Sequence, residues 1–259
     1  MVLSEKLGPE SPLSDFALQQ LATVRAIYEA DLPEFDDFIT KNALIKSALN
    51  IALIAHEEQT RDDGVTPYVN HPYEASLLAW KHLTAYNVNK DVVTQELLEE
   101  VVSTCLLHDV LEENSDHSEA TLARLLSLGH REEEREAREN RALRIAGYIA
   151  VLTPSKKSEK PETKKGWLMR KTLEAGTLIT RSELIVNLTK TADILANATE
   201  TLRNARSDAV GTKHSLQDRL SVIQARLKII QTEAETNPLL KSMGEELEKV
   251  AQTLSEPKG

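Results

Sequence analysis

Residues 42 to 59 read NALIKSALNIALIAHEEQ, and the spacing of the apolar side chains in this stretch constrains the fold strongly. Apolar residues that recur every three or four positions form one face of an α-helix, whereas a half-buried strand needs strict alternation. Helical spacing returns along the chain, and valine-rich alternating segments are absent. The sequence therefore predicts an all-α fold, a bundle of roughly nine to ten helices.

The same pattern predicts where the helices lie. The amphipathic segment 14–30 predicts a first helix, DLPEFDD at 31–37 predicts a turn, and a longer helix is expected from about Phe38. Glycine and proline in the polar stretch 57–72 predict a loop. Further helices are predicted over 73–86, 93–113, 118–128, 132–152, 180–205, 213–233 and 238–253.

Length and composition are those of one globular domain. The chain has 259 residues, of which 41% are hydrophobic and 28% are charged, so it is too apolar to be disordered. No repeat or Ser/Gly linker divides the helical segments. We expect a flexible N-terminus over residues 1–12, a single domain over 13–254 and a C-terminal tail over 255–259.

Charge and cysteine usage narrow the function classes. A formal net charge of −10 disfavours stable DNA or RNA binding, because it repels nucleic-acid phosphates. Cys105 is the single cysteine, the N-terminus lacks the apolar core of a signal peptide, and no apolar run approaches the roughly 20 residues that span a bilayer. We expect a cytoplasmic protein without membrane attachment, with its oligomeric state left open.

Residues 105 to 114, CLLHDVLEEN, place ionisable groups at the end of an apolar helix. The apolar face of this helix, continued by three and four residues, reaches His108, Asp109 and Glu112. A buried carboxylate costs several kcal/mol unless it is paired or binds a metal. A cation is therefore expected beside this helix, and Cys105 is expected to pack behind the site.

Two other segments carry groups of the same kind. In ELIVNLTKTADILANATETL, Lys190, Asp193 and Asn197 share one helix face because they are three or four residues apart. In PYVNHP, His71 precedes a proline that restrains its backbone. A simpler interpretation of Asp193 is an ion pair with Lys190 or with Arg203 on its own helix.

Two imidazoles and two carboxylates from three segments form a mixed nitrogen and oxygen donor set. Such a set suits divalent manganese, iron, cobalt or zinc. It also leaves coordination positions open for water and a phosphate oxygen, which distinguishes a catalytic centre from a structural one. The expected donors are His71, His108, Asp109 and Asp193.

Residues 156 to 171, KKSEKPETKKGWLMRK, are strongly basic. Seven basic residues stand against two glutamates, which is typical of a solvated loop but also of a phosphate grip. If this segment binds phosphate, the candidate phosphate-binding residues are Lys156, Lys157, Lys164 and Lys165.

Three motifs in order, RDDGVTPYVNHP, LLHDVLEE and KTADILAN, resemble those of the HD superfamily of metal-dependent phosphohydrolases. Within it they are most similar to the hydrolase domain of RelA/SpoT-type alarmone enzymes, including stand-alone members such as the metazoan SpoT homologues. The resemblance is strongest over residues 43–205 and implies an HD-domain helical bundle.

The resemblance also implies roles for individual residues. It assigns Mn²⁺ to the four donors named above, and activation of the attacking water to Glu112 and to Glu113, which stands where the family usually has Asp. VLTPSKK at 151–157 nearly matches a family turn that opens the basic segment. The implied substrate-binding residues are Arg61, Lys190, Asn197 and the four lysines of the basic segment.

The implied reaction, part of the stringent response, removes the 3′-diphosphate from a guanosine polyphosphate alarmone. ppGpp or pppGpp would give GDP or GTP plus pyrophosphate, so the partner is a small nucleotide. Two alternatives remain from the residues: an HD phosphohydrolase for another nucleotide or NADPH, and a catalytically weak nucleotide-sensing module.

Overall fold

A computed structural model describes residues 15–87, 93–113, 118–128, 135–153, 184–206, 216–233 and 237–256. Every regular element within these ranges is an α-helix, and nine of the helices there have at least seven residues. The predicted all-α fold class is therefore confirmed. The helices are α1 (Asp15–Gln20), α2 (Ala22–Ile27), α3 (Leu32–Lys41), α4 (Ala43–Ala55), α5 (Asn70–Asn87), α6 (Gln95–Leu107), α7 (Val110–Glu113), α8 (Glu119–Ser127), α9 (Arg135–Leu152), α11 (Leu184–Arg206), α12 (Leu216–Glu233) and α13 (Pro238–Ser255).

The turn predicted at 31–37 is wrong, because Leu32–Lys41 forms α3. Pro33 lies in the first turn of this helix, where a missing N–H costs nothing, so this proline starts a helix and does not break one. The long helix expected from Phe38 is interrupted at Asn42, whose extended backbone ends α3. The Asn42 side chain then caps α4 by accepting from two backbone amides.

Two further boundaries differ near the candidate site. Helix α5 begins at Asn70, so His71 lies in a helical first turn and not in the loop predicted to reach residue 72. The helix predicted over 93–113 is interrupted, since α6 ends at Leu107 with His108 as its C-cap and α7 follows. The predicted start of a helix at residue 180 lies outside the described residues.

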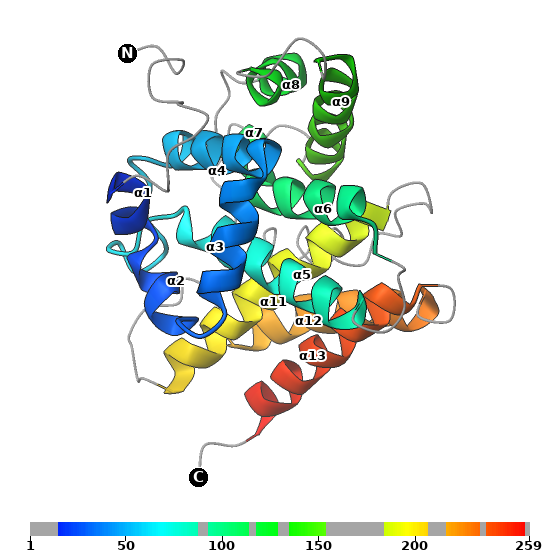
Figure 1. Cartoon of the computed structure of the whole chain (residues 1–259). Coiled ribbons are helices and arrows are strands. Elements are labelled where there is room, and N and C mark those ends of the chain that lie inside the picture. Colours follow the sequence, from blue (N-terminus) through cyan, green and yellow to red (C-terminus); the bar gives the residue numbers. More distant parts are fainter. Residues whose placement is uncertain are drawn as a thin grey trace, which may run out of the picture.

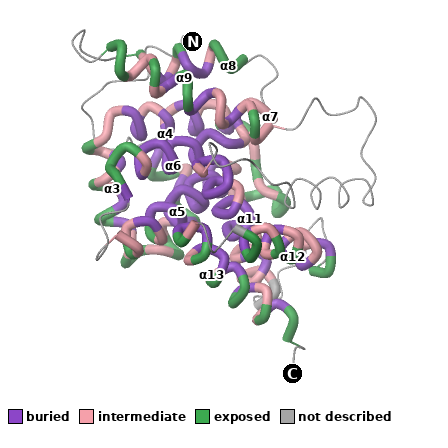
Figure 2. The backbone as a smooth tube through the Cα atoms, turned by 90° about the vertical axis from the view of Figure 1, so that its right-hand side faces the viewer, coloured by how far each residue is buried: buried purple, intermediate pink, exposed green. Residues whose placement is uncertain are grey.

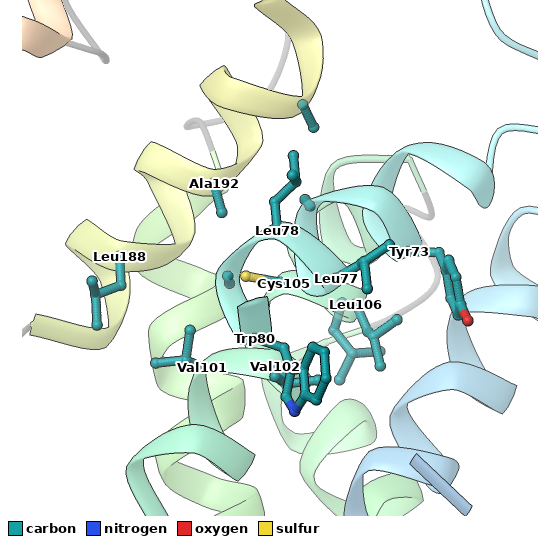
Figure 3. Close-up of a cluster of buried hydrophobic side chains, with 14 of the residues drawn as sticks. Tyr73, Leu77, Leu78, Trp80, Val101, Val102, Cys105, Leu106, Leu188 and Ala192 are labelled. Carbon is teal, nitrogen blue, oxygen red and sulfur yellow. The ribbon is translucent and has the colours of Figure 1, made fainter. Parts of the chain in front are cut away.

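Helices α5, α6 and α11 pack against one another and form the centre of the molecule. Helices α8 and α9 lie at one end and α12 and α13 at the other (Figure 1). The buried residues concentrate on the central helices (Figure 2). Figure 3 shows Cys105 of α6 among apolar side chains of α5 and α11, in a cluster where each fully buried large side chain stabilises the fold by about 1.5–3 kcal/mol.

None of the described helices is by itself long and apolar enough to cross a membrane. Only α3 and α4 taken together meet that test of length and composition, and they are bent by 104° at the break between them.

Candidate metal centre

His108 is held by the end of helix α6. Its Nδ1 lies 2.7 Å from the carbonyl oxygen of Cys105, one turn earlier. Since a carbonyl can only accept, Nδ1 carries the hydrogen and Nε2 is the nitrogen that is left to bind another group. This Nε2 is buried and has no hydrogen-bond partner among the described residues. A buried polar atom of this kind is costly unless something binds it.

His71 reaches the same place from the first turn of α5. Its Nε2 lies 3.2 Å from Oδ1 of Asp193 on α11 and 3.9 Å from Oδ2 of Asp109. The side chain is buried, and burial, followed by the nearby Arg61 charge, lowers the pKa of His71 below its usual value. His71 is therefore neutral at pH 7, which is the form that binds metal ions.

The second imidazole faces the same two carboxylates. Nε2 of His108 lies 3.2 Å from Oδ2 of Asp109 and 3.7 Å from Oδ1 of Asp193. The donor atoms of His71, His108 and Asp109 lie within 4.8 Å of one another. The structure thus brings together all four predicted donors, from the three segments that carry the motifs.

The electrostatics of this group require a positive charge. Burial by itself lowers the pKa of His108, but the carboxylates of Asp109 and Asp193 outweigh it and raise this pKa to about 10. Burial also disfavours ionised Asp109, yet the facing His108 holds its pKa well below the usual range. Without a metal the site takes up a proton on His108, at the atom where a metal would bind. Two imidazoles and two carboxylates therefore fit a divalent cation in both charge and donor type.

Neighbouring side chains orient the two carboxylates. The Tyr68 hydroxyl donates to Oδ2 of Asp109 at 2.8 Å. Lys190 donates to Oδ2 of Asp193 at 2.9 Å, and the Asn197 amide donates to Oδ1 of Asp193 at 2.7 Å. The ion pair of Asp193 with Lys190 exists, whereas Arg203 pairs with Glu74. Lys190 and Asn197 thus hold a candidate metal ligand, and supporting contacts of this type fix the direction of donor atoms.

The loop before α5 delivers Tyr68 and Arg61 to the site. It folds back on itself through hydrogen bonds from the Arg61 amide to the Thr66 carbonyl and from the Tyr68 amide to the Gln59 carbonyl, at 2.8 and 2.9 Å. Gly64 has a φ of 71° at its tip, a conformation that favours glycine. The polar composition of 57–72 predicted a loop but not this ordered turn.

Arg61 is bound to α11. Its guanidinium donates to Oδ1 of Asn197 at 3.1 Å, forms an ion pair with Glu200 and lies 5.4 Å from the centre of the Tyr68 ring. Burial lowers the pKa of Arg61, but Glu200 outweighs burial and raises it above its ordinary value. Glu200 was not among the predicted site residues, although it lies three positions after Asn197 on the same helix face.

A cleft of about 260 Å³ opens beside His71. Its lining is polar and holds two ion pairs, Arg61 with Glu200 and Arg203 with Glu74, the latter with contacts of 2.6 and 2.8 Å. The charges of each pair cancel and Asp63 adds a negative charge, so the cleft offers hydrogen-bonding groups without net positive charge. The residues that line the cleft include Val24, Arg61, His71, Glu74, Glu200 and Arg203.

Of the remaining predicted site residues, the structure describes Glu112 but not the side chain of Glu113 or the four lysines. Glu112 is half-buried on α7, one turn after Asp109. The side chain of Glu113 and the four lysines at 156, 157, 164 and 165 lie outside the described residues. Cys105 is fully buried and backs His108, and burial raises the pKa of its thiol to about 12, as expected for a packed rather than a reactive cysteine.

Arg226 of α12 could not be identified from the sequence. It is fully buried and donates to the Thr191 hydroxyl at 3.0 Å and to the Asn187 carbonyl at 2.7 Å. These contacts hold α12 against the segment of α11 that leads to Asp193. A buried arginine that binds neutral groups has no pattern in a single sequence, because its partners lie 35 and 39 residues away.

Fold and site together define a class of protein: an all-α chain with a buried centre of two imidazoles and two carboxylates. A comparison with models of known protein families finds no match to this chain, and a comparison with curated proteins also finds none. Function is therefore inferred from the chemistry of the site and from the three sequence motifs.

Proposed function

We propose that this protein is an HD-type, manganese-dependent phosphohydrolase that removes the 3′-diphosphate from a guanosine polyphosphate alarmone. One observation carries the proposal. His71, His108, Asp109 and Asp193 come from three motifs spread over more than a hundred residues. The donor atoms of the first three lie within 4.8 Å of one another, and Oδ1 of Asp193 lies 3.2 Å from His71 and 3.7 Å from His108. The three motifs supply the rest of the support, because they resemble those of the alarmone hydrolases in both order and content.

A divalent cation bound by these donors would supply Lewis-acid activation of a water molecule and neutralise phosphate charge. Glu112, one turn after Asp109, would accept the proton of the attacking water. Tyr68 holds Asp109, and Lys190 and Asn197 hold Asp193, so the carboxylates stay in place as charge develops. The water oxygen would bond to the phosphorus attached to the ribose 3′ oxygen as the bond from that phosphorus to the 3′ oxygen breaks. The 3′ oxygen would take the proton that Glu112 accepted, and the diphosphate with its new oxygen would be released as pyrophosphate.

The cleft beside His71 supports an orientation for a nucleotide. Its two ion pairs leave little positive charge free to bind phosphate, so an uncharged, hydrogen-bonding nucleoside suits it better. Phosphates would then lie toward the metal donors. Arg61, whose guanidinium already lies over the Tyr68 ring, would form one wall for the base.

The proposal is tested by incubating the protein with Mn²⁺ and a nucleotide panel, with products identified by chromatography and mass spectrometry. The panel holds ppGpp, its adenosine analogue, nucleoside mono- and triphosphates and NADPH. We expect GDP and pyrophosphate from ppGpp. Asp109→Asn should lower the rate by at least about 100-fold, because it removes a metal ligand. Asp37→Asn, in an exposed pair on α3, should leave the rate unchanged.

Failure to cleave ppGpp or its adenosine analogue with Mn²⁺ present would refute the alarmone assignment. Tight binding of ppGpp without turnover would favour the nucleotide-sensing module instead.

A second candidate is an HD-type phosphohydrolase for another nucleotide or NADPH. The Arg61–Glu200 ion pair favours it, because a carboxylate in the cleft changes which hydrogen-bonding groups a nucleoside can present there. Release of inorganic phosphate from a different member of the panel, with ppGpp left intact, would identify this activity.

A further inference from the structure

Asn70, the residue just before His71, makes an unusual set of backbone contacts. Its side-chain nitrogen, Nδ2, donates to the carbonyl of Gln20 at 2.7 Å and to the carbonyl of Pro67 at 2.9 Å. Its side-chain oxygen accepts from the amide of Val24 at 3.1 Å. The residue is buried, so these three bonds use nearly the full hydrogen-bonding capacity of the side chain in a place without competing water.

The bond to Pro67 closes the turn that carries two functional groups. Two backbone hydrogen bonds hold the same turn. The backbone amide of Asn70 donates to the carbonyl of Pro67 at 3.1 Å, and the backbone amide of His71 donates to the carbonyl of Tyr68 at 3.0 Å. Tyr68 in this turn binds Asp109, and His71 at its end faces Asp193. A change in the turn would therefore move one metal donor and the group that orients another.

The other two bonds hold the joint between α1 and α2. Gln20 is the last residue of α1, and Val24 lies in the first turn of α2, so Asn70 binds both sides of the break at Leu21. Val24 also lines the cleft beside His71. One side chain thus joins the metal-binding turn to a wall of the cleft.

We infer that Asn70 is a positioning residue that couples metal binding at His71 to the docking of helices α1 and α2. The inference rests on the metal centre of the proposed function but not on its substrate or its turnover. A metal bound to His71 would restrict the motion of the turn from Pro67 to His71. The Asn70 side chain would then move less as well, and its hydrogen bond with the Val24 amide would open less often. Coupling between two sites is reciprocal, so loss of the Asn70 contacts should also weaken metal binding.

The structure offers a matched control. Asn42 is another asparagine whose side chain binds the backbone, since its side-chain oxygen caps α4 by accepting from the amides of Leu44 and Ile45 at 3.1 Å each. It lies at the opposite end of α4 from His56, which contacts Tyr68, so a helix of 13 residues, about 20 Å long, separates Asn42 from the metal-binding turn. Removing either asparagine removes a buried or half-buried backbone clamp, but only Asn70 touches the turn.

The first measurement is hydrogen exchange of the unmodified full chain, with and without saturating Mn²⁺. We expect Mn²⁺ to slow exchange of the Val24 amide at least about tenfold and to leave the Leu44 and Ile45 amides within about twofold. Equal protection of all three amides, or no protection of Val24 in a protein that binds Mn²⁺, would overturn the inference. This measurement needs no variant, so it stands even if a substitution prevents folding.

The second measurement is the Mn²⁺ dissociation constant by electron paramagnetic resonance. Asn70→Ala should bind Mn²⁺ about tenfold more weakly, at the lower end of what residues behind a metal ligand contribute, and Asn42→Ala should bind as the wild type does. An Asn70→Ala affinity within about twofold of the wild type would refute the coupling and leave the proposed function intact. Absence of Mn²⁺ binding in the wild type would overturn both, whereas metal binding without hydrolysis would overturn only the proposed function.

Discussion

The two ring nitrogens of His108 have separate tasks, and two substitutions separate them. His108→Asn places an amide donor where Nδ1 stands, next to the Cys105 carbonyl, and removes Nε2. His108→Gln places an amide oxygen near the position of Nε2 and removes the Nδ1 donor. If Nε2 is a metal ligand, the first variant should keep the fold and lose the metal, and the second should keep part of the metal affinity.

The size of the effect follows from mass action. Free Mn²⁺ at 100 times its dissociation constant stabilises the folded protein by about 2.7 kcal/mol. In a chain of this length 1 kcal/mol shifts the melting temperature by about 2–4 °C, so the wild type should gain about 5–10 °C. A variant with about 100-fold weaker affinity gains only about 0.4 kcal/mol at the same Mn²⁺ concentration, or about 1 °C.

The assay is thermal unfolding of chelator-treated protein, followed by titration with Mn²⁺ and, for comparison, Mg²⁺. His108→Asn should melt below the metal-free wild type, because it removes the imidazole that faces Asp109 and Asp193, and it should respond little to Mn²⁺. An equal shift in His108→Asn and the wild type would show that Nε2 is not a ligand, and the assignment of the centre would fail.

Three further predictions concern stability and reactivity. The Cys105 thiol, whose pKa burial raises to about 12, should react with a disulfide reagent at pH 8 only as fast as the native protein opens, and a stoichiometric burst would contradict this. Gly244→Ala should lower the unfolding free energy by about 1–3 kcal/mol in urea titrations, because an added Cβ would lie 2.5 Å from Cγ2 of Ile230; unchanged stability would mean that α12 and α13 separate easily. Burial raises the pKa of Glu200, but the ion pair with Arg61 outweighs burial and lowers this pKa below its ordinary value of 4.5. The ion pair therefore stabilises the folded protein above pH 4.5, and this stabilisation is lost as the pH falls below 4.5. Glu200→Gln should cost about 1–3 kcal/mol at pH 7 and flatten the acid limb of the stability profile, and an unchanged acid limb would show that the pair contributes nothing.

The sequence indicated that His108, Asp109 and Asp193 would face one another, and the reason is physical. His108, Asp109 and Asp193 interrupt apolar helical patterns, and a charge on a buried face must meet a partner, so each residue signals a site without knowledge of the fold. Helical periodicity likewise placed most helices. The turn predicted around Pro33 was wrong because a proline is compatible with both a turn and the first turn of a helix, and the choice depends on whether Leu32, Phe35 and Ile39 find a core to pack against.

What surrounds the donors was not predictable, because it depends on contacts between distant residues. The ion pair of Arg61 with Glu200 joins residues 139 positions apart, and the Tyr68 bond to Asp109 spans 41 positions. Neither residue breaks a local pattern, since an arginine in a polar loop and a glutamate on a helix are ordinary. Only the packing of the loop against α11 turns them into parts of one site.

The arrangement of these contacts argues that the centre is a binding site and not an accident of packing. His108 is fixed through Nδ1, Asp193 is held by Lys190 and Asn197, and Asp109 is held by Tyr68. Three of the four candidate donors are therefore oriented by partners of their own, while Nε2 of His108 lacks a well-formed hydrogen bond among the described residues. Buried polar groups that serve stability alone are often replaced by apolar residues at no loss. In this set the supporting groups are satisfied and Nε2 of His108 faces carboxylate oxygens, so a proton or a metal cation at that position stabilises the group.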